Sequence, residues 1–118
     1  MLFRSLSLSG PCSVVEVRNN ALREFSINAS DLGLQPADVI AVKGGDPAHN
    51  ARVVVDTFNG QRGPVRDIVV LNAAAGLTVA GACASMEEGV ALAQASIDNG
   101  SALRVVEALK ISSNAVAR

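Results

Sequence analysis

The sequence predicts an α+β fold in which a small N-terminal sheet, built as a β-hairpin, precedes about four helices. Two β-prone runs come first, at residues 13–18 and 21–27. Segments with apolar residues at helical spacing occupy most of the chain after residue 46. Strands followed by helices, without alternation, are typical of α+β domains. The chain has 118 residues, 49% of them hydrophobic, which allows one domain at most and excludes a disordered segment.

The two β-prone runs are separated only by residues 19–20, both Asn. Asn tolerates the positive φ of a type I′ turn, so the sequence predicts a hairpin closed by a two-residue turn. This turn places Glu16 opposite Arg23 near the tip. It also places Val14 opposite Phe25 near the base, so a charge pair and an apolar pair support one register. An isolated hairpin is weak, and its outer edge would be open to strands that this chain does not contain.

The segment after the hairpin is predicted to be a connection. Residues 28–35 are polar and are interrupted by Gly33 and followed by Pro36, which leaves room for one helical turn. Residues 39–42 could add a short strand.

The first two helices have clear start signals. Asp46 can cap a helix that has Pro47 in its first position, and this helix ends at residues 59–60, Asn-Gly. Its apolar face comprises Ala51, Val54, Val55 and Phe58. Residues 63–64, Gly-Pro, begin a second helix that runs to about Gly81. This helix is apolar nearly all round, so we expect it to be central and buried.

The third and fourth helices follow the same pattern. Ser85 and Glu88 form a capping box at the start of the third helix, and residues 99–100, Asn-Gly, end it. Its apolar face comprises Met86, Val90, Ala93 and Ile97, and that of the last helix comprises Ala102, Val105, Val106 and Leu109.

Composition and charge exclude several classes of function. Ten basic and eleven acidic residues give a net charge of −1, and there is no basic stripe that would indicate nucleic-acid binding. The longest apolar run, residues 68–84, contains Asn72 and Thr78 and is about one turn short of spanning a bilayer. Cys12 and Cys83 lack metal-binding spacing and indicate small buried side chains in a reducing cytosol. We expect a soluble cytoplasmic protein.

Residues before the first helix could be interpreted as a phosphate loop. Lys43, Gly44 and Gly45 stand at a helix start, where free backbone N–H groups and the helix dipole attract anions. The alternative is an N-cap turn in which the Asp46 carboxylate already accepts from these N–H groups. We favour the cap, because a carboxylate there repels an anion.

Three further polar residues are candidate site residues. His49 is the only histidine and has no partner at triad spacing, so a solvent-facing role is favoured over catalysis. Asn50 could contact a ligand, but a hydrogen bond into the preceding loop is favoured. Asn72 lies within the apolar helix, where a buried amide must satisfy its hydrogen bonds. We expect it to bind neighbouring backbone, with a ligand role as the alternative.

The charged clusters have ordinary explanations. Arg62, Arg66 and Asp67 lie near a helix start and are predicted to be solvated. Glu87 and Glu88 could suggest a metal pair, but consecutive helical side chains point about 100° apart and Glu88 belongs to the capping box. From the residues alone we assign no catalytic, substrate-binding or metal-ligating residue.

Several motifs together resemble one enzyme family. They are Lys43-Gly44-Gly45-Asp46 with Asn50, then GPVRDIVVLNAAA, SMEEGV and IDNGSAL. From about Leu6 almost to its end, the chain resembles the C-terminal part of anthranilate phosphoribosyltransferase, a glycosyltransferase of tryptophan biosynthesis. The resemblance implies that residues 1–118 are a single C-terminal fragment of the α/β catalytic domain of the nucleoside phosphorylase/phosphoribosyltransferase fold. The enzyme transfers phosphoribosyl from phosphoribosyl diphosphate to anthranilate.

The start of the chain departs from the family. There an Asp-Glu pair that helps to hold magnesium precedes a Leu-Ser segment and a Gly-Pro turn, which correspond to residues 6–11 here. Arg4 and Ser5 occupy the positions of the pair. A guanidinium cannot bind magnesium, and a lone hydroxyl is a weak ligand. The family's diphosphate-binding glycine loop lies earlier in the whole enzyme. These departures suggest a substituted beginning, as after a truncation or an internal start.

Magnesium is therefore the metal of the parent family, and none is expected for this chain alone. We predict a packing scaffold without transferase activity of its own. Its expected partner is the missing N-terminal portion of the enzyme, with homo-oligomers possible and neither nucleic acid nor membrane as a partner. Two alternatives remain: a fragment of a pyrimidine nucleoside phosphorylase and a non-catalytic helical interaction module.

Overall fold

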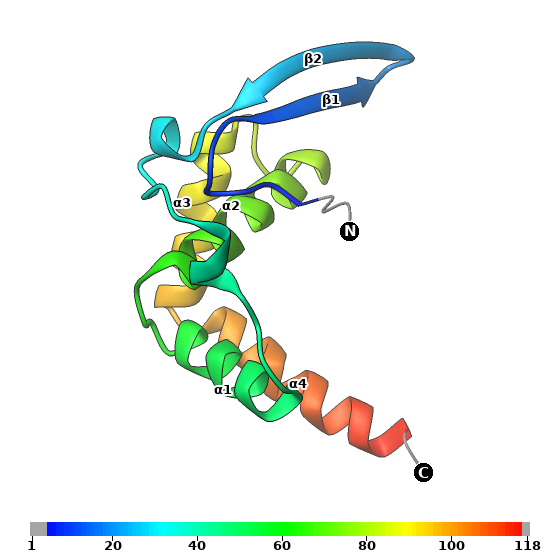
Figure 1. Cartoon of the computed structure of the whole chain (residues 1–118). Coiled ribbons are helices and arrows are strands. Elements are labelled where there is room, and N and C mark those ends of the chain that lie inside the picture. The colour runs from blue at the N-terminus through cyan, green and yellow to red at the C-terminus, as the bar shows by residue number, and fades with distance from the viewer. Residues whose placement is uncertain (1–4, 117–118) are drawn as a thin grey trace.

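The computed structural model describes residues 5–116, which form a two-stranded antiparallel sheet and four α-helices (Figure 1). The hairpin lies at one end of the molecule, α1 and α4 lie at the other, and α2 and α3 lie between them (Figure 1). The elements are β1 (Cys12–Arg18), β2 (Ala21–Ile27), the 3-10 helices η1 (Ala29–Leu32) and η2 (Val39–Val42), α1 (Pro47–Phe58), α2 (Pro64–Val79), α3 (Met86–Asp98) and α4 (Ser101–Val116). The predicted α+β order is confirmed.

The hairpin has the turn and the register that the sequence predicts. Residues 19 and 20 have φ of 52° and 60°, the left-handed values that a type I′ turn requires. Val14 lies opposite Phe25, and Glu16 lies opposite Arg23. The Nε of Arg23 is 3.2 Å from Oε1 of Glu16, so the charge pair near the tip is also present.

Residues 39–42 are not a strand, and that prediction was wrong. They form η2, in which the Asp38 carboxylate accepts a hydrogen bond of 2.9 Å from the N–H of Ile40. This local cap satisfies backbone groups that a strand would have to pair elsewhere. The single helical turn predicted within residues 28–35 is confirmed as η1, which ends at Gly33 with φ of 75°.

The core lies where α2 and α3 pack together beneath the hairpin. Its buried residues are Leu8, Ile27, Ala29, Leu34, Val70, Leu71, Ala74, Val90, Ala93 and Ile97. A Cβ added at Gly89 of α3 would lie 2.9 Å from the carbonyl oxygen of Ala74 in α2, so glycine allows this close approach.

The second predicted helix, α2, is central but is not buried all round. Val70 and Leu71 are fully buried, while Ala73, Gly76 and Val79 on the other side are exposed. The helix also ends at Val79, two residues before the predicted end at Gly81. The expected central position of this helix is confirmed, but its expected burial holds only for the side that carries Val70, Leu71 and Ala74. Among residues 5–116, no helix combines the length and apolar character that a bilayer crossing needs.

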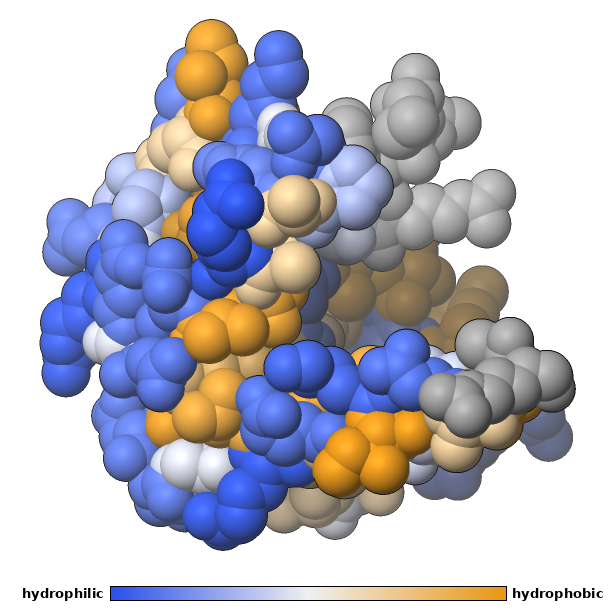
Figure 2. Space-filling view, turned by 90° about the horizontal axis from the view of Figure 1, so that it is seen from below, coloured by the Kyte–Doolittle hydropathy of each residue, from blue (hydrophilic) through white to orange (hydrophobic). Residues whose placement is uncertain are grey.

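The apolar faces of α1 and α4 are largely uncovered. Ala51 and Val54 on the predicted face of α1 are exposed, and the buried residue of this helix is Thr57. In α4 no residue is buried, and Val105 and Leu109 are 68% and 64% exposed. The view toward this end of the molecule shows hydrophobic residues at the surface among hydrophilic ones (Figure 2).

Candidate functional site

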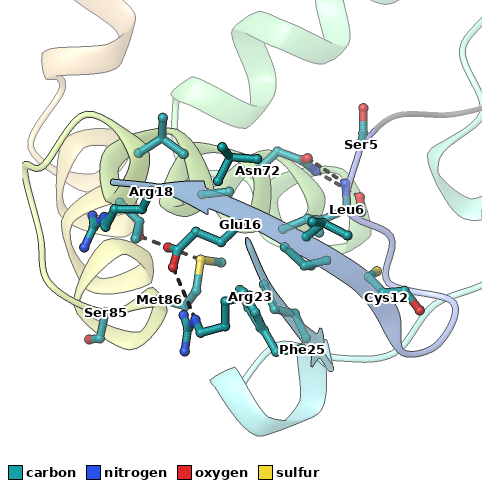
Figure 3. A pocket seen from close by; sticks show the side chains of 18 of the residues that line it. Ser5, Leu6, Cys12, Glu16, Arg18, Arg23, Phe25, Asn72, Ser85 and Met86 are labelled. Atoms are coloured by element: carbon teal, nitrogen blue, oxygen red, sulfur yellow. Dashed lines mark hydrogen bonds and ion pairs between the residues drawn. The ribbon is translucent and has the colours of Figure 1, made fainter. Parts of the chain in front are cut away.

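An open groove with a volume of about 730 Å³ lies between the hairpin and α2 (Figure 3). All seven residues of β1 line it, whereas β2 contributes only Arg23, Phe25 and Ile27. The helices contribute Asn72, Ala75, Thr78 and Val79 of α2, and Met86 with Ser85 from the start of α3. The groove is therefore bounded by β1 along its whole length.

Three charged residues line the groove, Glu16, Arg18 and Arg23, and the last forms an ion pair with the first. The guanidinium carbon of Arg23 lies 4.4 Å from the centroid of the Phe25 ring, and its Nε faces Glu16 (Figure 3). The Arg23 side chain is 66% exposed, so solvent screens the pair and its contribution to stability is small. Among the residues that the structure describes, neither side chain has a third polar partner that would orient it for acid-base chemistry.

Asn72 lines the groove and binds the backbone of Leu6. Its Oδ1 accepts from the Leu6 N–H at 2.9 Å, and its Nδ2 donates to the Leu6 carbonyl at 3.0 Å (Figure 3). Nδ2 also donates to the carbonyl of Ile68 at 3.0 Å. The predicted backbone role is confirmed. Both amide donors are used in this way, which leaves Asn72 little capacity for a ligand.

The loop before α1 is an N-cap turn rather than a phosphate loop. Oδ1 of Asp46 accepts from the N–H of His49 at 2.7 Å. Oδ1 of Asn50 accepts from the N–H of Gly45 at 2.8 Å, and its Nδ2 donates to the Gly45 carbonyl at 3.1 Å. His49 and Lys43 are exposed. The N–H groups of Gly45 and His49 are thus occupied by side chains of the cap, which agrees with the predicted N-cap turn.

Arg66 is buried, so the prediction of a solvated charge was wrong for this residue. It is 3% exposed, and its Nη1 lies 2.8 Å from Oδ1 of Asp98 at the end of α3. Outside this ion pair Nη1 has no hydrogen-bond acceptor within the described residues. The hydrogen bond and charge of Arg66 lower the pKa of Asp98 below its ordinary value of 3.8. The missed signal is spacing: Arg66 precedes Val70 by one helical turn, on the buried stripe of α2.

The neighbours of Arg66 behave differently from it. Arg62 is exposed, as predicted. Asp67 is half-buried, and its Oδ2 accepts from the N–H of Gln35 at 3.4 Å, which joins the connection to α2.

Of the two adjacent acidic residues in α3, Glu88 caps the start of the helix. Oε2 of Glu88 accepts from the N–H of Ala84 at 2.9 Å, and the N–H of Glu88 donates to Oγ of Ser85 at 3.2 Å. Glu87 is exposed. In the part of the chain that the structure describes, no three His, Cys, Asp or Glu side chains gather closely enough to hold a metal ion.

The remaining predicted positions are the cysteines and the two N-terminal residues. Both cysteines are free thiols; Cys83 is buried as predicted, and Cys12 is only half-buried. Ser5 is exposed. Arg4 lies outside the described residues.

Residues 4–103 match the sequence model of the glycosyl transferase family, a/b domain. The chain belongs to this family. Curated anthranilate phosphoribosyltransferases from Methylorubrum extorquens (strain PA1) and Thermomicrobium roseum are each 44% identical to it. These matches cover 93% and 95% of the chain but 33% of each relative, so the chain spans about a third of the curated relatives' length.

Solved structures of similar proteins agree with the sequence matches. The chain matches anthranilate phosphoribosyltransferase from Thermus thermophilus with a TM-score of 0.79 and 37% identity, over 86% of this chain and 30% of that one. The Saccharomyces cerevisiae enzyme in complex with 4-fluoroanthranilate matches with a TM-score of 0.76 and 25% identity, over 89% of this chain and 31% of that one. The chain therefore has the fold of part of a phosphoribosyltransferase α/β domain, as predicted. Its resemblance to part of this enzyme is confirmed, and a nucleoside phosphorylase fragment is not favoured.

Proposed function

We propose that the chain serves as the C-terminal part of the catalytic domain of an anthranilate phosphoribosyltransferase. In this role it supplies packing surface rather than reacting groups, and on its own it does not transfer phosphoribosyl. The observation that carries the proposal is the match to the Thermus thermophilus enzyme at 37% identity over 86% of this chain. A cytoplasmic location agrees with two free cysteines.

The polar side chains support a structural role. Asn72, Asn50 and Asp46 bind backbone groups of neighbouring turns, and Glu88 caps α3. Magnesium does not fit the described residues, because Ser5 offers one exposed hydroxyl where the family has a carboxylate.

The open surface of the chain supports a partner. Its accessible surface is 8259 Å², whereas a compact monomer of this mass would expose roughly 6,000 Å². The excess is on the scale that one subunit contributes to an obligate interface, roughly 1,000–2,500 Å². We propose that the partner is the remainder of the same catalytic domain, and that nucleic acid and membrane are not partners.

A reconstitution assay tests the proposal. The purified chain is mixed with the portion of the Thermus thermophilus enzyme that does not align with it, and transfer from phosphoribosyl diphosphate to anthranilate is measured. We expect no turnover by either polypeptide alone and turnover by the mixture. Turnover by the isolated chain would contradict the scaffold role.

A further inference from the structure

Two Asn-Gly pairs end helices of this chain, residues 59–60 after α1 and residues 99–100 after α3. In such a pair the backbone nitrogen of glycine can attack the side-chain amide carbon of asparagine, because glycine has no Cβ to hinder the approach. The attack closes an imide ring and releases ammonia, and water then opens the ring to aspartate or isoaspartate. Asn59 and Asn99 are both exposed, so exposure alone does not distinguish the two pairs.

Local opening controls this reaction at both pairs. The attacking nitrogen must lose its proton, but the N–H of Gly60 donates to the Thr57 carbonyl at 3.0 Å. In the same way, the N–H of Gly100 donates to the Ile97 carbonyl at 3.2 Å. Each helix end must open before its glycine nitrogen can react, so the pair whose opening disturbs less of the structure reacts faster.

The turn at residues 99–100 is held by the start of α4. Oδ1 of Asn99 accepts from the N–H of Ser101 at 2.9 Å, so the side chain that would react is fixed. The N–H of Arg104 donates to the Gly100 carbonyl at 3.1 Å, and Nη2 of Arg104 donates to Oγ of Ser101 at 3.0 Å. Opening this turn therefore breaks the junction between α3 and α4 as well as the bond of the glycine N–H.

The turn at residues 59–60 is held less firmly. Across it the N–H of Gln61 donates to the Asp56 carbonyl at 3.0 Å, but within residues 5–116 no hydrogen bond fixes the Asn59 side chain. A Cβ added at Gly60 would meet no atom within 4 Å, so the turn has open space around it. The connection that follows runs along the outside of the molecule to α2 (Figure 1).

We propose that Asn59 is a site of spontaneous deamidation in the folded chain and that it reacts faster than Asn99. The product places a carboxylate at the C-terminal end of α1, where the helix dipole disfavours negative charge. Isoaspartate also adds a methylene group to the backbone of the turn, so the original turn does not re-form. Deamidation thus loosens the connection between α1 and α2 irreversibly, and it does so whether or not the proposed function holds.

A time course of peptide mass spectrometry on the purified chain tests the proposal. One sample is kept folded at mildly alkaline pH, and a second is kept in urea at a concentration that unfolds it. In the folded sample Asn59 is expected to convert about fivefold or more faster than Asn99, since a hydrogen bond to the reacting side chain must break only at Asn99. In urea the two positions are expected to convert at similar rates, because each is an Asn-Gly pair without folded structure around it.

Asn59→Gln is the matched control. It keeps a side-chain amide at this position, but closure of the larger imide ring is slower. The variant is expected to lose the fast conversion and to leave that of Asn99 unchanged. Equal rates at the two positions in the folded sample, or conversion of both in urea only, would overturn the proposal.

Discussion

Asn72 and Asn50 each bind both backbone groups of one residue, but in different surroundings. Asn72 joins α2 to Leu6, 66 positions away and partly buried, whereas Asn50 joins α1 to Gly45 at the surface. Removing a side chain that satisfies buried backbone groups costs more than removing one whose partners can turn to water. Asparagine is therefore expected to contribute more to the free energy of unfolding at position 72 than at position 50.

The first prediction compares these two residues. Asn72→Ala is expected to lower the free energy of unfolding by about 1–3 kcal/mol, and Asn50→Ala by less than about 1 kcal/mol. Urea unfolding of both variants measures the difference. Equal losses for the two variants would show that the Leu6 contact is not the stronger one.

The second prediction concerns Asp98, whose pKa Arg66 lowers below 3.8. A carboxylate with a lowered folded-state pKa stabilises the fold above its unfolded-state pKa, and this contribution is lost as the pH falls through the folded-state value. Asp98→Asn is therefore expected to lower the urea midpoint at about pH 7 and to match the original chain at a pH well below 3.8. A difference that persists unchanged in acid would mean that the charge of Asp98 is not what stabilises buried Arg66.

At the scale of elements, the tight contact between α2 and α3 depends on one glycine. A Cβ at Gly89 would lie 3.0 Å from both Cα and Cβ of Ala74, so the two helices would have to separate. Gly76, on the exposed side of α2, has no atom within 4 Å of the same added Cβ. Substituting each glycine by alanine therefore separates two effects on stability: the steric clash with α2, which only Gly89→Ala introduces, and the higher helix propensity of alanine, which both variants share.

The third prediction uses this pair. Gly89→Ala is expected to destabilise the chain by about 1–3 kcal/mol through overpacking. Gly76→Ala is expected to stabilise it by up to about 1 kcal/mol, since alanine is the better helix former. Thermal unfolding of both variants provides the measurement. Stabilisation by Gly89→Ala would contradict the close approach of α2 and α3.

The elements that the sequence predicts best are those set by neighbouring residues. Residues 19–20 determine the turn and hence the register, and Asp46 and Ser85 determine two helix starts. In the candidate site, the backbone role of Asn72 followed from an amide inside an apolar helix. These features depend on local chemistry, which the sequence contains in full.

The features that could not be predicted from the sequence depend on contacts between elements that lie far apart along the chain. The burial of Arg66 requires Asp98 from another helix, 32 positions later, and the groove requires β1 to lie beside α2. The strand predicted at residues 39–42 failed because it has no partner strand within the described residues, while a local cap was at hand. The expected burial of α2 holds on one side only, because no other element within residues 5–116 covers Ala73, Gly76 and Val79.

At the scale of the whole molecule, the chain exposes more surface than its mass requires. Its radius of gyration is 15.5 Å, whereas a compact domain of 118 residues has roughly 13.5 Å. The uncovered faces of α1 and α4 and the free edge of β1 account for this openness in structural terms. The chain is therefore expected to be more stable as part of a larger domain than alone.

A chimaeric enzyme tests whether this chain can replace the C-terminal part of an active anthranilate phosphoribosyltransferase. The aligned part of the Thermus thermophilus enzyme is replaced by residues 6–116 of this chain, and transfer of phosphoribosyl to anthranilate is measured. A second chimaera also includes Arg4 and Ser5, which the resemblance places at the magnesium-binding acidic pair. We expect the first to be active and the second to be slower by about a hundredfold or more, because charge stabilisation of several kcal/mol is lost. A first chimaera that folds and yet shows no transfer would contradict the account.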